Sequence, residues 1–248
     1  MSIQPSPRWS NILIVIVVAA LSACKTDAPS VTPAPSSSSS SPSSPSSRSS
    51  SSSTSSHANF DFYLLDLSWS PDYCATSGND DPQQCSIGKK LGFVLHGLWP
   101  QYNQGYPQNC STQKLPDSVK AKFRGLYPND SLFTHEWEKH GTCTGLSPEE
   151  YLTLTRQLKE SVNIPFAYRA PEQPFRTTTA QLKKDFIAAN STFSDAGLAV
   201  NCSGSGRFLQ ELQICFSVDG KPITCSREVQ NDATKTCQAA DFLVQNVK

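Results

Sequence analysis

Residues 60–69 read FDFYLLDLSW, and this aromatic and aliphatic run opens the part of the chain with the composition of a folded domain. A run of this length and content predicts a buried β-strand. Residues 91–95 (LGFVL) and 207–218 (RFLQELQICFSV) have the same strand character. Residues 222–225 can pair with the last of these strands across an Asp-Gly turn.

Two helix starts can be recognised by their capping residues. Ser147 is placed as an N-cap and is followed by proline, and Glu150 closes a capping box with it. Thr178 and Gln181 mark a second start in the same way. A third, short helix is expected earlier in the chain. The predicted helices cover residues 116–126, 147–160 and 178–189.

Strands and helices follow one another without the regular βαβ alternation of a parallel sheet. This order predicts an α+β domain, with an antiparallel sheet flanked by helices. The formal net charge of the 248 residues is zero, with 21 basic and 21 acidic side chains. Proteins that hold nucleic acid by bulk positive charge are usually clearly basic, so the composition argues against that class. An enzyme that contacts one or two phosphates needs only local charge.

Nine cysteines indicate an oxidising compartment, because disulfides persist outside the cytosol. Eight of them follow residue 58, and an even number in an exported domain predicts a disulfide framework. Eight cysteines allow 105 pairings, so their spacing leaves the connectivity open. The alternative of a structural zinc site is disfavoured because no CxxC pair occurs. The eight are Cys74, Cys85, Cys110, Cys143, Cys202, Cys215, Cys225 and Cys237.

Residues 1–23 resemble a lipoprotein signal peptide. Arg8 supplies positive charge, and residues 12–21 (ILIVIVVAAL) are apolar but shorter than the roughly 20 residues that span a bilayer. Residues 21–24 (LSAC) resemble a bacterial lipobox, in which Cys24 becomes the lipidated first residue. The alternative is an ordinary signal peptide with a cysteine near its cleavage site.

Residues 24–58 are nearly all Ser, Pro, Thr and Ala. Such a segment buries too little apolar surface to offset the entropy of ordering, so we expect a flexible tether in which His57 has no role. The folded domain is expected over residues 59–248. We therefore expect an exported monomer in the periplasm or on the cell surface, lipid-anchored to the outer membrane. No protein partner is indicated.

The three histidines of the folded domain lie in two dense motifs. In the first, residues 92–101 (GFVLHGLWPQ), a strand delivers His96 to its end, where Gly97 and Pro100 are expected to break it. Trp99 offers a flat face on which a base can stack. The alternative for this segment is a core histidine and a core tryptophan in a buried turn.

The second motif is residues 135–143 (HEWEKHGTC). On a helix of about 100° per residue, His135, Glu136, Lys139 and His140 share one face, and Trp137 can anchor the opposite side in the core. The alternative is a solvated charged face. The zinc motif HExxH requires a histidine where this chain has Lys139, so a zinc hydrolase is the disfavoured alternative.

A group of histidines and a lysine can cleave RNA by acid–base catalysis without a metal ion. Histidine titrates near pH 6.5, so one imidazole can act as a base while another acts as an acid. RNA carries its own nucleophile, the 2′-hydroxyl, beside the phosphodiester. A lysine stabilises the negative charge that develops on the phosphoryl oxygens. No cofactor or metal is required.

Residues 93–101 (FVLHGLWPQ) and 135–143 (HEWEKHGTC) resemble the two active-site segments of the ribonuclease T2 family. Softer resemblance extends over most of residues 59–248. It implies an α+β fold and an endoribonuclease that cuts single-stranded RNA through a 2′,3′-cyclic phosphate to 3′-phosphate ends. The other open reading is a non-catalytic surface lipoprotein that binds RNA or a protein.

The resemblance also implies roles for individual residues. His140 would be the general base, His96 the general acid, and His135 a phosphate contact. Glu136 and Lys139 would stabilise the phosphorane-like state.

Further residues and the cysteine pairs follow from the same resemblance. Trp99 would contribute to a base site, which Tyr102 or Tyr106 would extend. Gln101 stands where some members have an aspartate, so we expect low base specificity. The implied disulfides are Cys74–Cys85, Cys110–Cys143, Cys202–Cys237 and Cys215–Cys225.

Overall fold

The computed structural model describes residues 59–78 and 81–248. The predicted signal peptide, the lipidation of Cys24 and the tether with His57 all lie outside the described residues. Among the residues described, no helix is long and apolar enough to cross a membrane.

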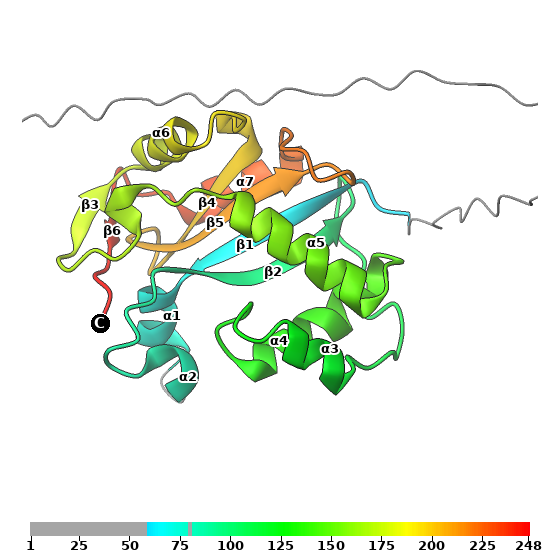
Figure 1. Cartoon of the computed structure of the whole chain (residues 1–248). Coiled ribbons are helices and arrows are strands. Elements are labelled where there is room, and N and C mark those ends of the chain that lie inside the picture. The colour runs from blue at the N-terminus through cyan, green and yellow to red at the C-terminus, as the bar shows by residue number, and fades with distance from the viewer. Residues whose placement is uncertain (1–58, 79–80) are drawn as a thin grey trace, which may run out of the picture. The chain divides into compact units, whose positions relative to one another are not determined.

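A six-stranded sheet forms the centre of the described residues (Figure 1). The strand order is β2-β1-β5-β6-β3, and β4 also pairs with β5. All pairs are antiparallel except β5–β6, which is parallel, so the expected antiparallel sheet is confirmed in all but this pair. The strands are β1 (Phe62–Trp69), β2 (Phe93–Gln101), β3 (Phe175–Thr177), β4 (Leu198–Ser203), β5 (Phe208–Phe216) and β6 (Phe242–Val244).

The helices surround this sheet, and the predicted α+β class is confirmed. The Ser147 hydroxyl accepts from the Glu150 N–H, and the Glu150 carboxylate accepts from the Ser147 N–H, so the capping box is formed. The α-helices are α1 (Ser70–Thr76), α2 (Pro82–Cys85), α3 (Asp117–Lys122), α4 (Asp130–Lys139), α5 (Pro148–Ser161), α6 (Thr179–Ala189) and α7 (Arg227–Thr236). The 3-10 turns are η1 (Gly141–Cys143), η2 (Phe166–Tyr168) and η3 (Asp195–Gly197).

The prediction that Gly97 and Pro100 end the second strand is wrong, because β2 continues to Gln101. β2 lies at an edge of the sheet and pairs with β1 alone. An edge strand tolerates proline because one row of its N–H groups has no ladder partner. The expected hairpin after β5 is reduced to a single bridge between Phe216 and Pro222.

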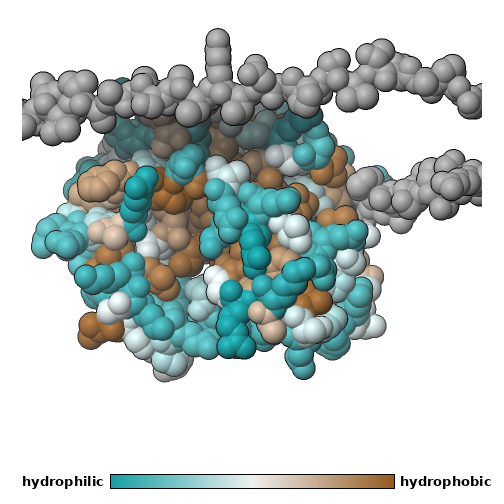
Figure 2. Space-filling model, in the orientation of Figure 1, coloured by the Kyte–Doolittle hydropathy of each residue, from teal (hydrophilic) through white to brown (hydrophobic). Residues whose placement is uncertain are grey.

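The two faces of the sheet carry different residues. On the core face, Tyr63, Leu65, Leu67 and Trp69 of β1 are buried in the main hydrophobic core. Helix α5 covers this face over β1 and β2, and its outward side is hydrophilic (Figures 1 and 2). Tyr151 of α5 donates a hydrogen bond to the Leu98 carbonyl at 2.8 Å. The opposite side, here called the site face, carries Asp66 of β1, His96 and Trp99 of β2, and Glu211 of β5.

The cysteines pair as Cys74–Cys85, Cys110–Cys143, Cys202–Cys237 and Cys215–Cys225. These are the pairs that the family resemblance implied. The second bridge joins the loop after β2 to η1, directly after α4. It therefore ties together the two segments that carry the histidine motifs.

Candidate active site

A β-bulge aims His96 at the site face. Asp66 pairs with Gly97 and Leu67 pairs with Leu95, so His96 has no partner in the register. A bulge of this kind re-aims a side chain and is common beside active sites. Here it leaves Leu95 buried in the core while the His96 side chain is about one-third exposed on the other face.

Gly97 permits the close approach of α4 to β2. A Cβ at this position would collide with Glu136 Oε2 and Trp99 Nε1. These two atoms meet there because Trp99 Nε1 donates to Glu136 Oε2 at 2.6 Å. The hydrogen bond joins the two motifs, and it brings Glu136 Oε1 to 3.9 Å from His96 Nε2.

Helix α4 presents the second motif. Its N-cap is Asn129, whose side chain accepts from the Leu132 N–H, and it ends at Lys139 with His140 as the C-cap. Glu136 and His140 are buried and His135 is exposed. Trp137 is buried on the other side and donates to the Gln113 carbonyl at 2.8 Å, as expected of an anchor.

Trp99 lies close to both His96 and His140. Its ring centroid is 5.1 Å from that of His96 and 5.2 Å from that of His140. The Tyr106 ring is 5.8 Å from His140. Within the described residues, His140 Nδ1 has no hydrogen-bond partner although it is buried. Two imidazoles therefore lie beside one indole, and the imidazole of His140 has a ring nitrogen without a protein partner.

The surroundings shift the pKa values of His96 and His140 in opposite directions. Burial, and then the positive charges of Lys139, His135 and His96, lower the pKa of His140 to about 3. Burial also opposes the charged form of His96. The nearby Asp66 carboxylate, the hydrogen bond with Glu211 and the charge of Glu136 outweigh it and raise the pKa of His96 far above its usual range. Near neutral pH His140 is therefore neutral and His96 is positively charged.

The pKa of Glu136 lies between those of the two histidines. Burial raises its pKa to about 7, against the opposing effects of the His96 charge and the Trp99 hydrogen bond. Near neutral pH its carboxyl can therefore be protonated or ionised.

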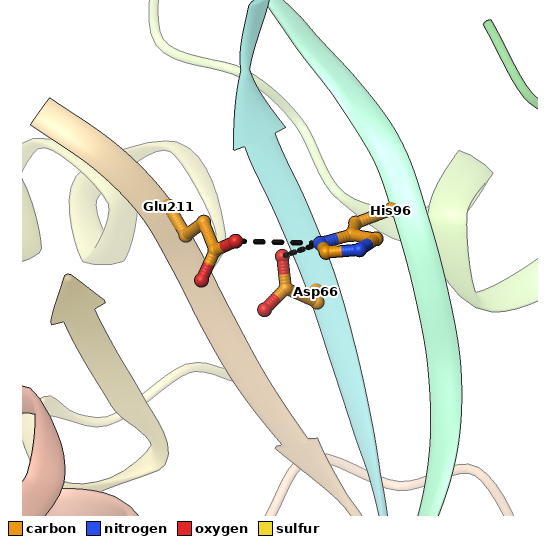
Figure 3. A group of neighbouring side chains, drawn as sticks. All are labelled: Asp66, His96 and Glu211. Atoms are coloured by element: carbon orange, nitrogen blue, oxygen red, sulfur yellow. Dashed lines mark hydrogen bonds and ion pairs between the residues drawn. The ribbon is translucent and has the colours of Figure 1, made fainter. Parts of the chain in front are cut away.

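Two carboxylates beside His96 were missed by the sequence analysis. His96 Nδ1 lies 3.3 Å from Glu211 Oε1 and 3.5 Å from Asp66 Oδ1 (Figure 3). A charged residue inside an apolar strand, as in FYLLDLSW and FLQELQICF, was the available signal. The three side chains each bring one polar atom within 4.8 Å of the others, so they form one compact cluster on the site face.

Two cavities adjoin the histidines. One of about 630 Å³ is lined by His96, His135 and Glu211, among others. The second, of about 280 Å³, is lined by all four residues expected to contact a base, together with Glu211. Those four are Trp99, Gln101, Tyr102 and Tyr106. The structure thus brings His96, Trp99, Glu136 and His140 close together, and it places the four expected base contacts around one cavity.

The comparisons with known proteins point to one family. The sequence model of the ribonuclease T2 family matches residues 60–225. A ribonuclease of Aeromonas hydrophila is 39% identical over 199 residues, covering 76% of this chain and 87% of that protein. Ribonuclease DdI of Dictyostelium discoideum is 29% identical over 187 residues, covering 69% and 80%. Ribonuclease MC1 from bitter gourd seeds shares the fold, with a TM-score of 0.55 and 23% identity over 74% of this chain and 99% of that chain.

Proposed function

This chain belongs to the ribonuclease T2 family and is an endoribonuclease, and we propose that it cuts single-stranded RNA by metal-independent transesterification between two histidines. The observation that carries the proposal is the placement of His96 and His140 beside the same indole, Trp99, with the pKa of one raised and that of the other lowered. Acid and base catalysis by two such groups needs no metal.

In the first step His140 removes the proton of the 2′-hydroxyl. The 2′-oxygen attacks phosphorus, and a 2′-O–P bond forms as the P–O5′ bond breaks. His96 gives its Nε2 proton to the departing 5′-oxygen, so the products are a 2′,3′-cyclic phosphate and a free 5′-hydroxyl. Each histidine begins in the protonation state that its surroundings favour.

The second step reverses the roles. His96, now neutral, removes a proton from water, and the hydroxide attacks the cyclic phosphate. His140 returns its proton to the 2′-oxygen as the 2′-O–P bond breaks. A 3′-phosphate is formed and both histidines regain their starting states.

The remaining polar residues of the second motif stabilise the phosphoryl group. Lys139 supplies positive charge where negative charge develops on the phosphoryl oxygens, and exposed His135 contacts the phosphate. Glu136, with its pKa near 7, can donate a hydrogen bond to a phosphoryl oxygen in its protonated form. These roles are supported by their position around His96 and His140.

The two cavities are assigned to the nucleotides on either side of the scissile bond. The smaller one offers Trp99, Tyr102 and Tyr106 for stacking. Gln101 at its edge is neutral and can both donate and accept, which favours low base specificity. The larger cavity beside His96 and His135 then takes the other nucleotide.

We also propose that the protein is exported and anchored through lipidated Cys24, with residues 24–58 as the tether and RNA as its sole substrate partner. The four disulfides of the domain support an oxidising compartment. Cys24→Ser should move the protein from the membrane fraction to the soluble fraction. Retention in the membrane would contradict lipidation.

The decisive experiment is digestion of polymeric RNA by the full chain between about pH 5 and 7, in the range where histidine titrates, with excess chelator. We expect 2′,3′-cyclic phosphate ends that convert to 3′-phosphates. Activity lost in chelator and restored by zinc would replace this mechanism with that of a zinc hydrolase. Binding without cleavage would leave an RNA-binding lipoprotein.

A further inference from the structure

We propose that Asp66 and Glu211 form a carboxylate pair that positions His96 as an imidazolium, with Nδ1–H held by the pair and Nε2–H presented to the leaving 5′-oxygen. The inference rests on the proposed function and deepens it, because it assigns two positioning residues to the general acid. The pair approaches one ring nitrogen only, as Figure 3 shows.

The sheet itself assembles this group from three strands. Asp66 pairs with Gln213 of β5 and Gly97 of β2, and Glu211 pairs with Ser68 of β1. Side chains two residues apart along neighbouring strands share a face, so Asp66 and Glu211 point the same way. The bulge in β2 then turns His96 toward them.

The buried carboxylate of Asp66 makes a positive charge at His96 favourable. The Asp66 side chain is fully buried, and its Oδ2 accepts from Gln213 Nε2 at 2.8 Å. Within the described residues Oδ1 has no hydrogen-bond partner, and it lies 3.5 Å from His96 Nδ1. A buried carboxylate oxygen without a donor is costly, and a cation beside it offsets that cost.

Glu211 also favours the positively charged form of His96. Burial and the nearby charge of Asp66 raise the pKa of Glu211, while the His96 contacts lower it. An imidazolium between two repelling carboxylates relieves the repulsion. Removal of either carboxylate should therefore weaken the hold on the proton.

The hydrogen bond at Nδ1 also fixes which nitrogen acts as the acid. A carboxylate that accepts from one ring nitrogen sets the orientation of the imidazole and leaves the other nitrogen to react. Nε2 lies on the side of α4, 3.9 Å from Glu136 Oε1. The charged and titratable groups that face His96 are Asp66 from β1, Glu211 from β5, and Glu136, His135 and His140 from α4 and its C-cap.

The test is the pH profile of kcat/KM for a dinucleotide, measured with the full chain and with Glu211→Gln and Asp66→Asn. Both changes keep the shape and remove the charge. We expect the alkaline limb of each variant to move to lower pH by about one pH unit or more, as is typical when an adjacent opposite charge is lost. Limbs that coincide with the wild-type limb would overturn the proposal.

Asp185→Asn is the matched control. This carboxylate on α6 accepts from Tyr168 Oη at 2.9 Å and from Gln181 Nε2 at 2.7 Å, away from both motifs. Its loss should lower stability without moving the alkaline limb. Because Asp66→Asn alters a buried site and can impair folding, the partly exposed Glu211 gives a variant that keeps the test decisive.

A second substrate distinguishes a specific loss of acid catalysis from a general loss of activity through altered structure. A nucleoside 3′-(p-nitrophenyl phosphate) has a leaving group that needs no proton. At a pH above the alkaline limb, kcat/KM of Glu211→Gln for the dinucleotide should fall about tenfold for each pH unit by which the limb has moved, and far less for the aryl ester. Equal losses on both substrates would show a merely structural role and overturn the inference.

Imidazole NMR supplies a readout besides activity, with the His96 signals assigned from His96→Ala. The pKa of His96 should fall in Glu211→Gln. If the wild-type protein fails to cut RNA in chelator, the proposed function fails and the inference with it. If His96→Ala is inactive but Glu211→Gln retains the wild-type profile and His96 pKa, the inference alone fails.

Discussion

The core face and the site face of the sheet are built from alternate residues of the same strands, yet they bury different chemistry. On β1, Leu65 and Leu67 enter an apolar core, while Asp66 between them enters a cluster of ionisable groups. The core face follows the general rule that apolar burial drives folding. The site face buries carboxylates and imidazoles at a cost, and the carboxylates beside His96 and the positive charges around His140 give the two imidazoles opposed proton affinities.

Substitutions at the two histidines proposed as acid and base should give the largest effects. His96→Ala and His140→Ala should each lower RNA cleavage by roughly 10²–10⁴-fold, the usual contribution of one acid or base. Activity is compared per folded molecule, because His96→Ala leaves the buried Asp66 carboxylate without its cation and should also lower the thermal unfolding midpoint. Substantial activity in either folded variant would contradict the acid–base assignment.

The core face should respond in the opposite way. Leu65 is fully buried, so Leu65→Ala should lower the free energy of unfolding by about 2–5 kcal/mol through lost apolar contacts and a cavity. Denaturant unfolding measures this change. The specific activity of the folded fraction should stay near wild type, and a loss as large as that of His96→Ala would mean that the two faces are coupled.

Gly97 is where the two motifs meet, and Gly97→Ala sharpens the comparison. The added Cβ collides with Glu136 and Trp99, so α4 must shift away from β2. We expect a destabilisation of about 1–3 kcal/mol, typical of overpacking, together with a fall in kcat. A variant with wild-type kcat would show that the spacing between the motifs tolerates displacement.

The smallest effect concerns the acid limb of the pH profile. The low pKa of His140 means that it stays neutral, and able to accept a proton, until the pH falls toward about 3. After burial, the charge of Lys139 is the largest cause of that lowering. Lys139→Gln should therefore raise the pKa of His140 and move the acid limb of kcat/KM to higher pH, whatever happens to the maximal rate. An acid limb that moves to lower pH would contradict the conclusion that Lys139 lowers the pKa of His140.

Much of the site could be predicted because its residues are local in sequence. The motif in residues 135–143 lies on one helix and its C-cap, and the helix repeat alone places Glu136 and His140 together. The capping box of α5 was predicted for the same reason, since Ser147 and Glu150 contact each other within one turn.

What depends on strand pairing could not be predicted in this way. The break at Gly97 and Pro100 was expected from local propensity, but β2 continues because it pairs with β1 along a sheet edge. The parallel contact of β5 with β6 likewise joins segments that are distant in the sequence.

The sequence by itself determined which residues are the candidates for the chemistry and which local elements hold them, because helix periodicity and capping act over a few residues. Only the tertiary structure placed Asp66 and Glu211 on His96, since these side chains come from three strands and are separated by up to 145 positions, from 66 to 211. Their meeting depends on strand register and on one bulge. A slip of one residue in β1 or β5 would turn its carboxylate to the other face of the sheet, and loss of the bulge in β2 would turn His96 away from both.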